Sequence, residues 1–184
     1  PRYKVDEMIF IVDAEEFTHG FPSVELIGKY QKKLFRLKEA LNSIGVSYSL
    51  NPWIIQGHDS RGRNANDSYD GLTPLVHPDG MKEDAMCCYL SAGWRSYMKE
   101  TWTLYAETEL KVIWIEDDFR SFGTHACFCQ LHLNRFSEHI GEKVSREQLV
   151  QAMLKPGLPH PWRREFLQMQ GDIQVEISAF LAET

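Results

Sequence analysis

The stretch MIFIVD at residues 8–13 is an apolar run without polar alternation. This pattern is typical of a strand that is buried on both faces of a parallel sheet. A helix is predicted after Ser23, a suitable N-cap, because apolar residues recur every three or four positions from Ile27 to Leu41. Gly45 is a stop signal, and a second strand follows directly at 46–53. Strand, helix, glycine and strand in this order predict a βα unit that leads into a parallel neighbour.

The rest of the chain continues this alternation. Residues 54–86 are dense in Gly, Asp, Asn and Ser and are predicted to form a long loop. A helix with an aromatic stripe is expected at 91–107, and a third strand, KVIWIEDDFR, at 111–120. Three helices should follow: one at 131–140, one that opens with a capping box, and a long one from Trp162.

We therefore expect an α/β fold with a parallel sheet in a single domain spanning residues 1–184. Three strands do not close a barrel, and a (β/α)₈ barrel typically needs about 250 residues. The chain is accordingly predicted to be a small open sheet or part of a TIM barrel. Open strand edges promote association, so we expect a homo-oligomer or a piece of a longer chain.

Charge and composition narrow the classes of function. The net charge of −6 and the pI of about 5.6 argue against a nucleic-acid partner. No apolar run approaches the length needed to span a membrane, and the charged opening shows no secretion signal. Four cysteines are too few for a disulfide scaffold, so a reducing, cytoplasmic location is expected.

Polar and aromatic side chains gather where the predicted strands end. Functional groups of parallel α/β folds lie at the carboxyl ends of strands. Acids with an aromatic platform are typical of a carbohydrate site, where one carboxylic acid protonates the leaving oxygen. The alternative is that these acids form a solvated strand end or pair with the arginine beside them. The residues in question are Asp13, Asn51, Trp53, Glu116, Asp117, Asp118 and Arg120.

A second constellation consists of cysteines and a histidine. Cys127, Cys129 and His132 lie in the run CFCQLH, and an upstream cysteine pair precedes the predicted helix at 91. Structural zinc sites take four Cys or His ligands in a tetrahedron, so Cys88 is the fourth predicted ligand. The spacing leaves open whether Cys87 or Cys88 fills that position.

The stretch from the second strand to the short helix after the cysteines resembles the catalytic barrel of glycoside hydrolase family 42, the β-galactosidases. The fourth strand of that family ends in an Asn-Glu pair, and a C-x-C-x-x-C run follows after a fixed gap. A further Cys opens the preceding helix. The corresponding stretches here are WIEDDF (114–119), CFCQLH (127–132) and CYLS (88–91).

The resemblance implies strands 2–4 of a (β/α)₈ barrel and a retaining glycosidase with a structural zinc ion. It places Asp118 on the general acid/base glutamate and Asp117 on the preceding asparagine. It also places Cys88, Cys127, Cys129 and His132 on the zinc ligands. Two departures from the family matter. The Asn-Glu pair is replaced by Asp117-Asp118, and the strand that supplies the family's nucleophile, the seventh, has no counterpart in this sequence.

Three functions are consistent with these residues. The first is part of a β-galactosidase-type enzyme acting on a carbohydrate substrate. The second is a non-catalytic carbohydrate-binding or structural module fastened by zinc. The third is metal-assisted hydrolysis at Asp13, His19 and His58 with the acids of the third strand, although no familiar metal-ligand spacing supports it.

Overall fold

A parallel βα unit forms the N-terminal part of the protein. The computed structural model describes residues 4–14, 18, 20–57, 69–116, 119–121, 126–157 and 159–184. In it β1 (Glu7–Val12) pairs in parallel with β2 (Ser47–Pro52), and α2 (Val24–Asn42) connects them. The Ser23 hydroxyl accepts a hydrogen bond from the Leu26 N–H at 3.2 Å, and so caps the helix as predicted. The predicted βα unit is therefore confirmed.

The predicted third strand runs parallel to β2 but forms only a short bridge. The Leu50 N–H donates to the Val112 carbonyl at 3.0 Å, and the Trp114 N–H donates to the Leu50 carbonyl at 2.8 Å. The preceding contact joins the Lys111 N–H to the Tyr48 carbonyl. Lys111 and Trp114 are three residues apart, whereas Tyr48 and Leu50 are two apart. This extra residue interrupts the ladder in the manner of a bulge.

The prediction of a long loop at 54–86 is wrong in its second half. There, β3 (Pro74–Val76) and β4 (Lys82–Cys87) pair as an antiparallel hairpin. Its turn is closed by the His77 N–H, which donates to the Met81 carbonyl at 2.8 Å. The turn-forming residues HPDG resemble an irregular loop, and β3 is too short to show an alternating pattern.

The helices lie close to their predicted positions. α3 (Ala92–Ala106) buries its aromatic stripe, and α4 (Gln130–Ile140) follows the second cysteine pair. α5 (Arg146–Leu154) begins with the predicted capping box between Ser145 and Gln148. α6 (Trp162–Ala182) is the longest and contacts α3, α4 and α5.

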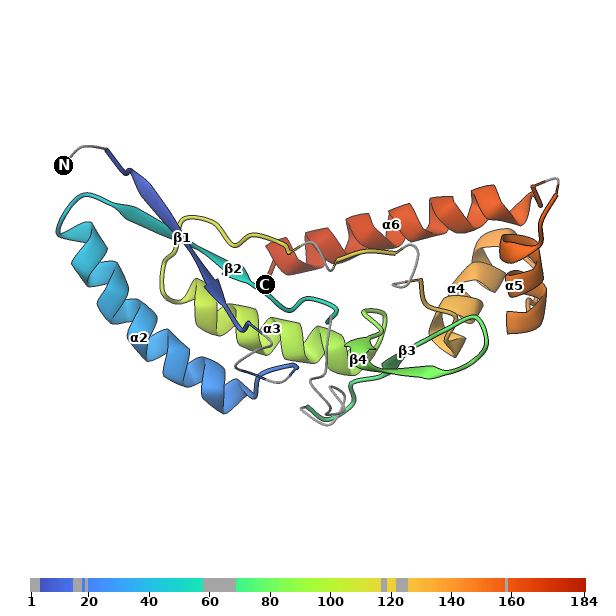
Figure 1. The fold of residues 1–184 in the computed structure, drawn as a ribbon, viewed down its shortest axis with the longest axis horizontal. Helices are drawn as coiled ribbons and strands as arrows, with labels where there is room; N and C mark the ends of the chain where they lie inside the picture. The colour runs from blue at the N-terminus through green and yellow to red at the C-terminus, as the bar shows by residue number, and fades with distance from the viewer. Residues whose placement is uncertain are drawn as a thin grey trace.

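The architecture is mixed α/β, with two two-stranded sheets and no closed barrel among the described residues. α2 and α3 lie side by side along the parallel strands, and α6 runs from the end that carries α4 and α5 back to the middle of the molecule, where the C-terminus lies (Figure 1). The main core lies between these helices and the sheet. Within the described ranges, no helix has both the length and the apolar character needed to cross a membrane.

Candidate functional site

The four predicted metal ligands meet in one buried cluster. Cys88, Cys127, Cys129 and His132 are all buried, and their ligand atoms lie within 4.8 Å of one another. They come from three places in the chain: the end of the β3–β4 hairpin, the segment before α4, and the first turn of α4. The fold therefore brings together residues that are up to 44 positions apart.

The distances within this cluster match a tetrahedral metal site. Cys88 Sγ lies 3.6 Å from Cys129 Sγ and 3.5 Å from His132 Nδ1, and Cys129 Sγ lies 3.4 Å from that nitrogen. Zinc bonds of about 2.3 Å to sulfur and about 2.0–2.1 Å to nitrogen give tetrahedral edges of about 3.8 Å (S···S) and about 3.6 Å (S···N). Cys88, Cys129 and His132 are thus spaced as a zinc set requires, and the ligand atom of Cys127 lies within 4.8 Å of theirs.

Local structure explains how the ligands converge. Cys129 is the N-cap residue of α4, and His132 lies three residues later, so both side chains face the same side of the first turn. Cys88 and Cys127 are positioned by hydrogen bonds to β3 and to the residue before it. The Cys88 N–H donates to the Thr73 carbonyl at 2.7 Å, and the Val76 N–H donates to Cys127 Sγ at 3.5 Å.

The structure also separates the two adjacent upstream cysteines. Cys88 joins the cluster, whereas Cys87 packs in the main hydrophobic core and is not among the four grouped ligands. Burial alone raises the pKa of the Cys87 thiol well above its usual range. Cys87 is therefore a packing residue, and the alternative left open by the sequence is decided in favour of Cys88.

The electrostatics of the cluster suit a cation. Hydrogen bonds from Cys127 and Cys88 hold the pKa of Cys129 far below its ordinary value, while hydrogen bonds with Cys127 and Cys129 raise the pKa of Cys88. Burial lowers the pKa of His132, but hydrogen bonds to the thiols outweigh it and raise that pKa to about 9. Three thiols facing one another cannot all ionise unless a positive charge balances them, and a divalent metal supplies that charge.

Sequence reasoning missed the surroundings of the histidine. The His132 ring lies edge-on to Tyr89, with 5.6 Å between ring centroids. Its Nε2 is buried and has no hydrogen-bond partner among the described residues. Tyr89 directly follows the ligand Cys88, but an aromatic residue at that position has no distinctive pattern in the sequence.

A second cluster of polar side chains lies at the carboxyl end of β2 and of the segment at 111–116, which was predicted to be the third strand. The Asn51 amide nitrogen lies 3.5 Å from Glu116 Oε1, and the Asn51 amide oxygen is buried with no partner in the described part of the chain. Two of the predicted substrate-binding residues are thus brought together. Two further predicted residues lie nearby in the sequence. Trp53 is half-buried and packs against the core, and Arg120 is exposed.

Asp13 lies apart from that pair. Its backbone is left-handed (φ 62°), its side chain is 6% exposed, and its Oδ2 accepts a hydrogen bond from the Tyr105 hydroxyl at 2.6 Å. Burial raises the pKa of Asp13 to about 7, although the bond from Tyr105 lowers it. The carboxyl group therefore points toward α3. The other predicted residues, Asp117 and Asp118, lie outside the described residues, as do His19 and His58.

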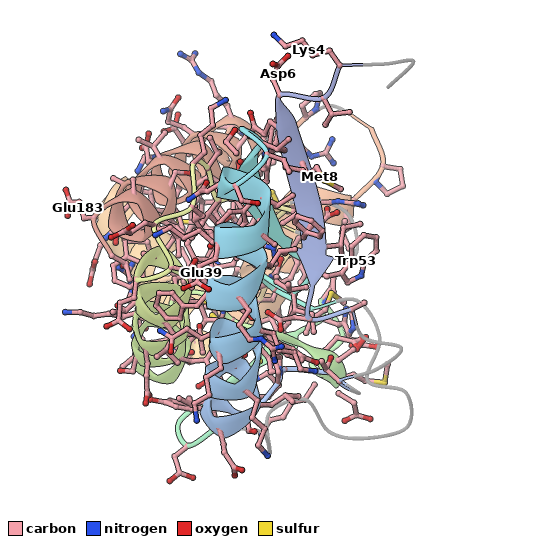
Figure 2. All side chains as sticks on the ribbon, turned by 90° about the vertical axis from the view of Figure 1, so that its left-hand side faces the viewer. Lys4, Asp6, Met8, Glu39, Trp53 and Glu183 are labelled. Carbon is pink, nitrogen blue, oxygen red and sulfur yellow. The ribbon has the colours of Figure 1, made fainter. Side chains whose placement is uncertain are left out.

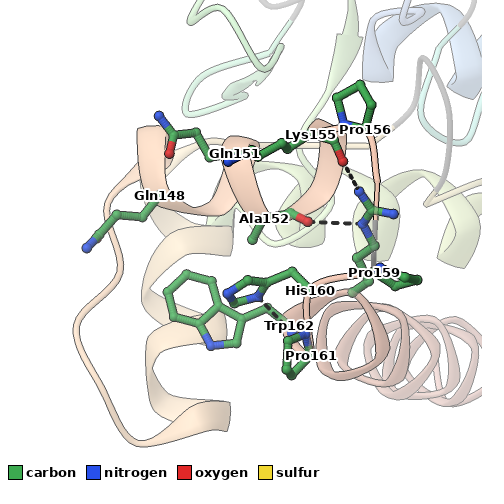
Figure 3. Close-up of a pocket in the computed structure, with 10 residues that line it drawn as sticks. Gln148, Gln151, Ala152, Lys155, Pro156, Pro159, His160, Pro161 and Trp162 are labelled. Carbon is green, nitrogen blue, oxygen red and sulfur yellow. Dashed lines mark hydrogen bonds between the residues drawn. The ribbon is translucent and has the colours of Figure 1, made fainter.

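A cleft of about 550 Å³ between α5 and the start of α6 contains none of the predicted site residues. Dashed lines in Figure 3 reach the carbonyls of Ala152 and Lys155. These carbonyls accept hydrogen bonds from the Arg163 guanidinium, at 3.0 and 2.5 Å. This cation therefore satisfies the last carbonyls of α5. His160 and Trp162 pack edge-on beside it, with 5.0 Å between their ring centroids. These contacts explain the cleft as a helix–helix junction.

Comparison of the chain with protein-family models, with curated proteins and with solved structures gives no match. Function is therefore inferred from the residues and their geometry.

Proposed function

We propose that this protein is a zinc-fastened α/β domain whose zinc ion has a structural role. The observation that carries the proposal is the spacing of Cys88, Cys129 and His132, which fits the edges of a zinc tetrahedron. Cys127 completes the set. Four protein ligands leave no open position for a substrate or water, as is usual for structural zinc.

The structural role follows from what the ligands join. The β3–β4 hairpin has only three residues in its first strand, and α4 begins with no side-chain cap. A metal held by Cys88 on one side and by Cys127, Cys129 and His132 on the other would tie hairpin and helix together. The free energy of metal binding then becomes free energy of folding.

The test is the metal content of the purified chain, measured by inductively coupled plasma mass spectrometry. We expect about one zinc per chain, as a single tetrahedral site requires. Cys127→Ala should abolish zinc binding, whereas Cys87→Ala removes an equally buried thiol that is not in the cluster and should retain it. Metal-replete preparations without zinc, or equal zinc in both variants, would contradict the proposal.

A second proposal concerns the carboxyl edge of the parallel strands, which we infer to be a glycoside site of the β-galactosidase type. It is supported by the pairing of Asn51 with Glu116, by the buried Asn51 oxygen without a described partner, and by the resemblance in WIEDDF. In this assignment Asp118 is the general acid/base, and Asp117 binds the sugar with Asn51 and Glu116. The resemblance takes the nucleophile from a later strand, which makes the complete parent the enzyme.

The glycoside proposal has its own test, because zinc content does not report on it. Binding of a galactoside inhibitor to the parent should weaken in Asn51→Ala and Glu116→Gln. The control is Glu109→Gln, an acid at the other end of the same segment that pairs with Lys38. Hydrolysis should fall at least 100-fold in Asp118→Asn, as loss of a general acid implies. Sugar binding without turnover would instead favour the non-catalytic carbohydrate-binding module.

A further inference from the structure

The segment at 111–115 has an unpaired edge. Because the Val112 carbonyl and the Trp114 N–H both bond to Leu50, the backbone groups of Ile113 point away from β2. Neither of them has a hydrogen-bond partner among the described residues. The sheet therefore ends, on this side, in a donor and an acceptor that are open to a further strand.

An apolar slot adjoins this edge. It has a volume of about 290 Å³ and is lined by Ile113 and Ile115, by Trp102 of α3 and by Leu181 of α6, with small residues between them. The volume is at the lower limit of small-molecule sites, which span about 300–1,000 Å³. Its position beside a free strand edge suits the side chains of an added strand.

The opposite edge of the same sheet is formed by β1. The Asp6 and Val12 carbonyls accept hydrogen bonds from Ser47 and Trp53, so even-numbered residues of β1 direct their backbone groups to β2. Odd-numbered residues, including Ile9, direct theirs outward. Met8, Ile9 and Ile11 are 41%, 50% and 57% exposed. β1 lies at the rim of the molecule in Figure 2.

β1 also lacks the usual protection of an edge strand. Natural edges carry Lys, Pro or a bulge, but β1 is a regular ladder of six residues, EMIFIV, with a single charge at its start. The sheet face that carries Ile9, Ile11 and Trp114 is exposed as well. An open edge beside exposed apolar side chains favours a partner that adds a further strand.

We propose that a second copy of this chain is that partner, and that β1 of one copy adds in parallel to the 111–115 edge of the next. The two edges complement each other. One supplies a regular strand with an exposed apolar side chain, Met8, on the side that faces the helices, and the other supplies the slot. Lys111, at the start of the 111–115 edge, already pairs with Glu7 of its own copy at 2.5 Å, so the match between the two edges lies in their backbone groups and in the slot.

The contact is heterologous, because the β1 edge of one copy meets the 111–115 edge of the next. Such contacts continue beyond a dimer, into a ring when the rotation closes and into a filament when it does not. This distinguishes the arrangement from a symmetric pairing of two β1 strands, which stops at two copies. The proposal does not rest on zinc binding or on glycoside binding.

Two proline variants test it, each blocking one edge only. Ile9→Pro removes an outward N–H of β1, and Ile115→Pro does the same at the other edge, so both spare the bonds to β2. Val175→Lys, at an even more exposed apolar residue of α6 (71%), is the control. Light scattering coupled to size-exclusion chromatography should show species larger than a dimer for the zinc-loaded chain and for the control. Each proline variant should associate at least tenfold more weakly.

A mixture of the two proline variants gives the sharpest result. Each retains the edge that the other has lost, so an equimolar mixture should form a dimer and stop there. Circular dichroism of each variant establishes that it is folded. A monomeric unmodified chain at all concentrations would overturn the proposal. So would association that Ile9→Pro abolishes but folded Ile115→Pro leaves intact, since that result indicates symmetric β1 pairing.

Discussion

The two ends of this molecule differ in how well their side chains and backbone groups are buried and paired. At the cysteine end, every side chain of the Cys₃His cluster is buried, and the hairpin, the segment before α4 and α4 itself are linked through it. At the sheet end, two strands and a short bridge carry exposed apolar residues, and no further strand of the described residues pairs with their outer edges. A cluster of strong ligands can stabilise a small unit locally, whereas a parallel sheet needs cover on both faces.

The largest effect is expected from removing metal at the cysteine end. Chelation of the zinc-loaded chain should lower the free energy of unfolding by several kcal/mol, a part of the roughly 10–16 kcal/mol that zinc contributes in zinc-finger peptides. Hydrogen exchange should rise first in the β3–β4 hairpin and the first turn of α4. Identical melting with and without a strong chelator would contradict the contrast between the two ends.

At the sheet end, Asp13 should make stability depend on pH. Its pKa is raised from 3.8 to about 7 on folding, so its stabilising contribution is complete below about pH 4 and is lost as the pH rises through about 7. The loss amounts to at most about 4 kcal/mol, at about 1.36 kcal/mol per pKa unit. Asp13→Asn should therefore show a flatter profile in urea denaturation between pH 4 and 8. Parallel profiles for the two proteins would contradict this assignment.

A smaller effect is expected at the close contact between α3 and the segment that leads into β3. Gly93, in the first turn of α3, lies against the backbone of Gly71, and a Cβ added there would overlap the Gly71 carbonyl. Gly93→Ala should destabilise the protein by about 1–3 kcal/mol or more. Gly171→Ala is the matched control, because no atom lies within 4 Å of the added Cβ, and it should stabilise α6 by about 0.5–1 kcal/mol. Equal thermal shifts in both variants would contradict the close approach.

The smallest effect concerns α5, which depends on neither the cluster nor the sheet. Ser145→Ala removes the hydroxyl that accepts the Gln148 N–H at 3.3 Å. The loss of this cap should cost about 1 kcal/mol. Zinc content should remain unchanged in the same sample. A concurrent loss of zinc would mean that α5 and the cluster are coupled more tightly than their separation in the fold indicates.

Local patterns explain which parts of the fold could be predicted. The βα unit follows from an apolar strand, a capped amphipathic helix and a glycine, all read within about 45 residues of sequence. The hairpin at 74–87 was missed because a strand of three residues shows no periodicity. The orientation of Asp13 was missed because a strand pattern does not reveal a left-handed residue at the strand's end.

By itself, the sequence determined which residue types could form a metal site and where the first βα unit and the helices lie, because residue type and periodicity carry that information locally. Tertiary structure alone decided that Cys88 rather than Cys87 enters the cluster, and that Asn51 meets Glu116 while Asp13 turns to Tyr105. It also decided that no other strand of the described residues pairs with the outer edges of the sheet. These outcomes depend on which segments pack against each other, and contacts between distant residues leave no local pattern in a single chain.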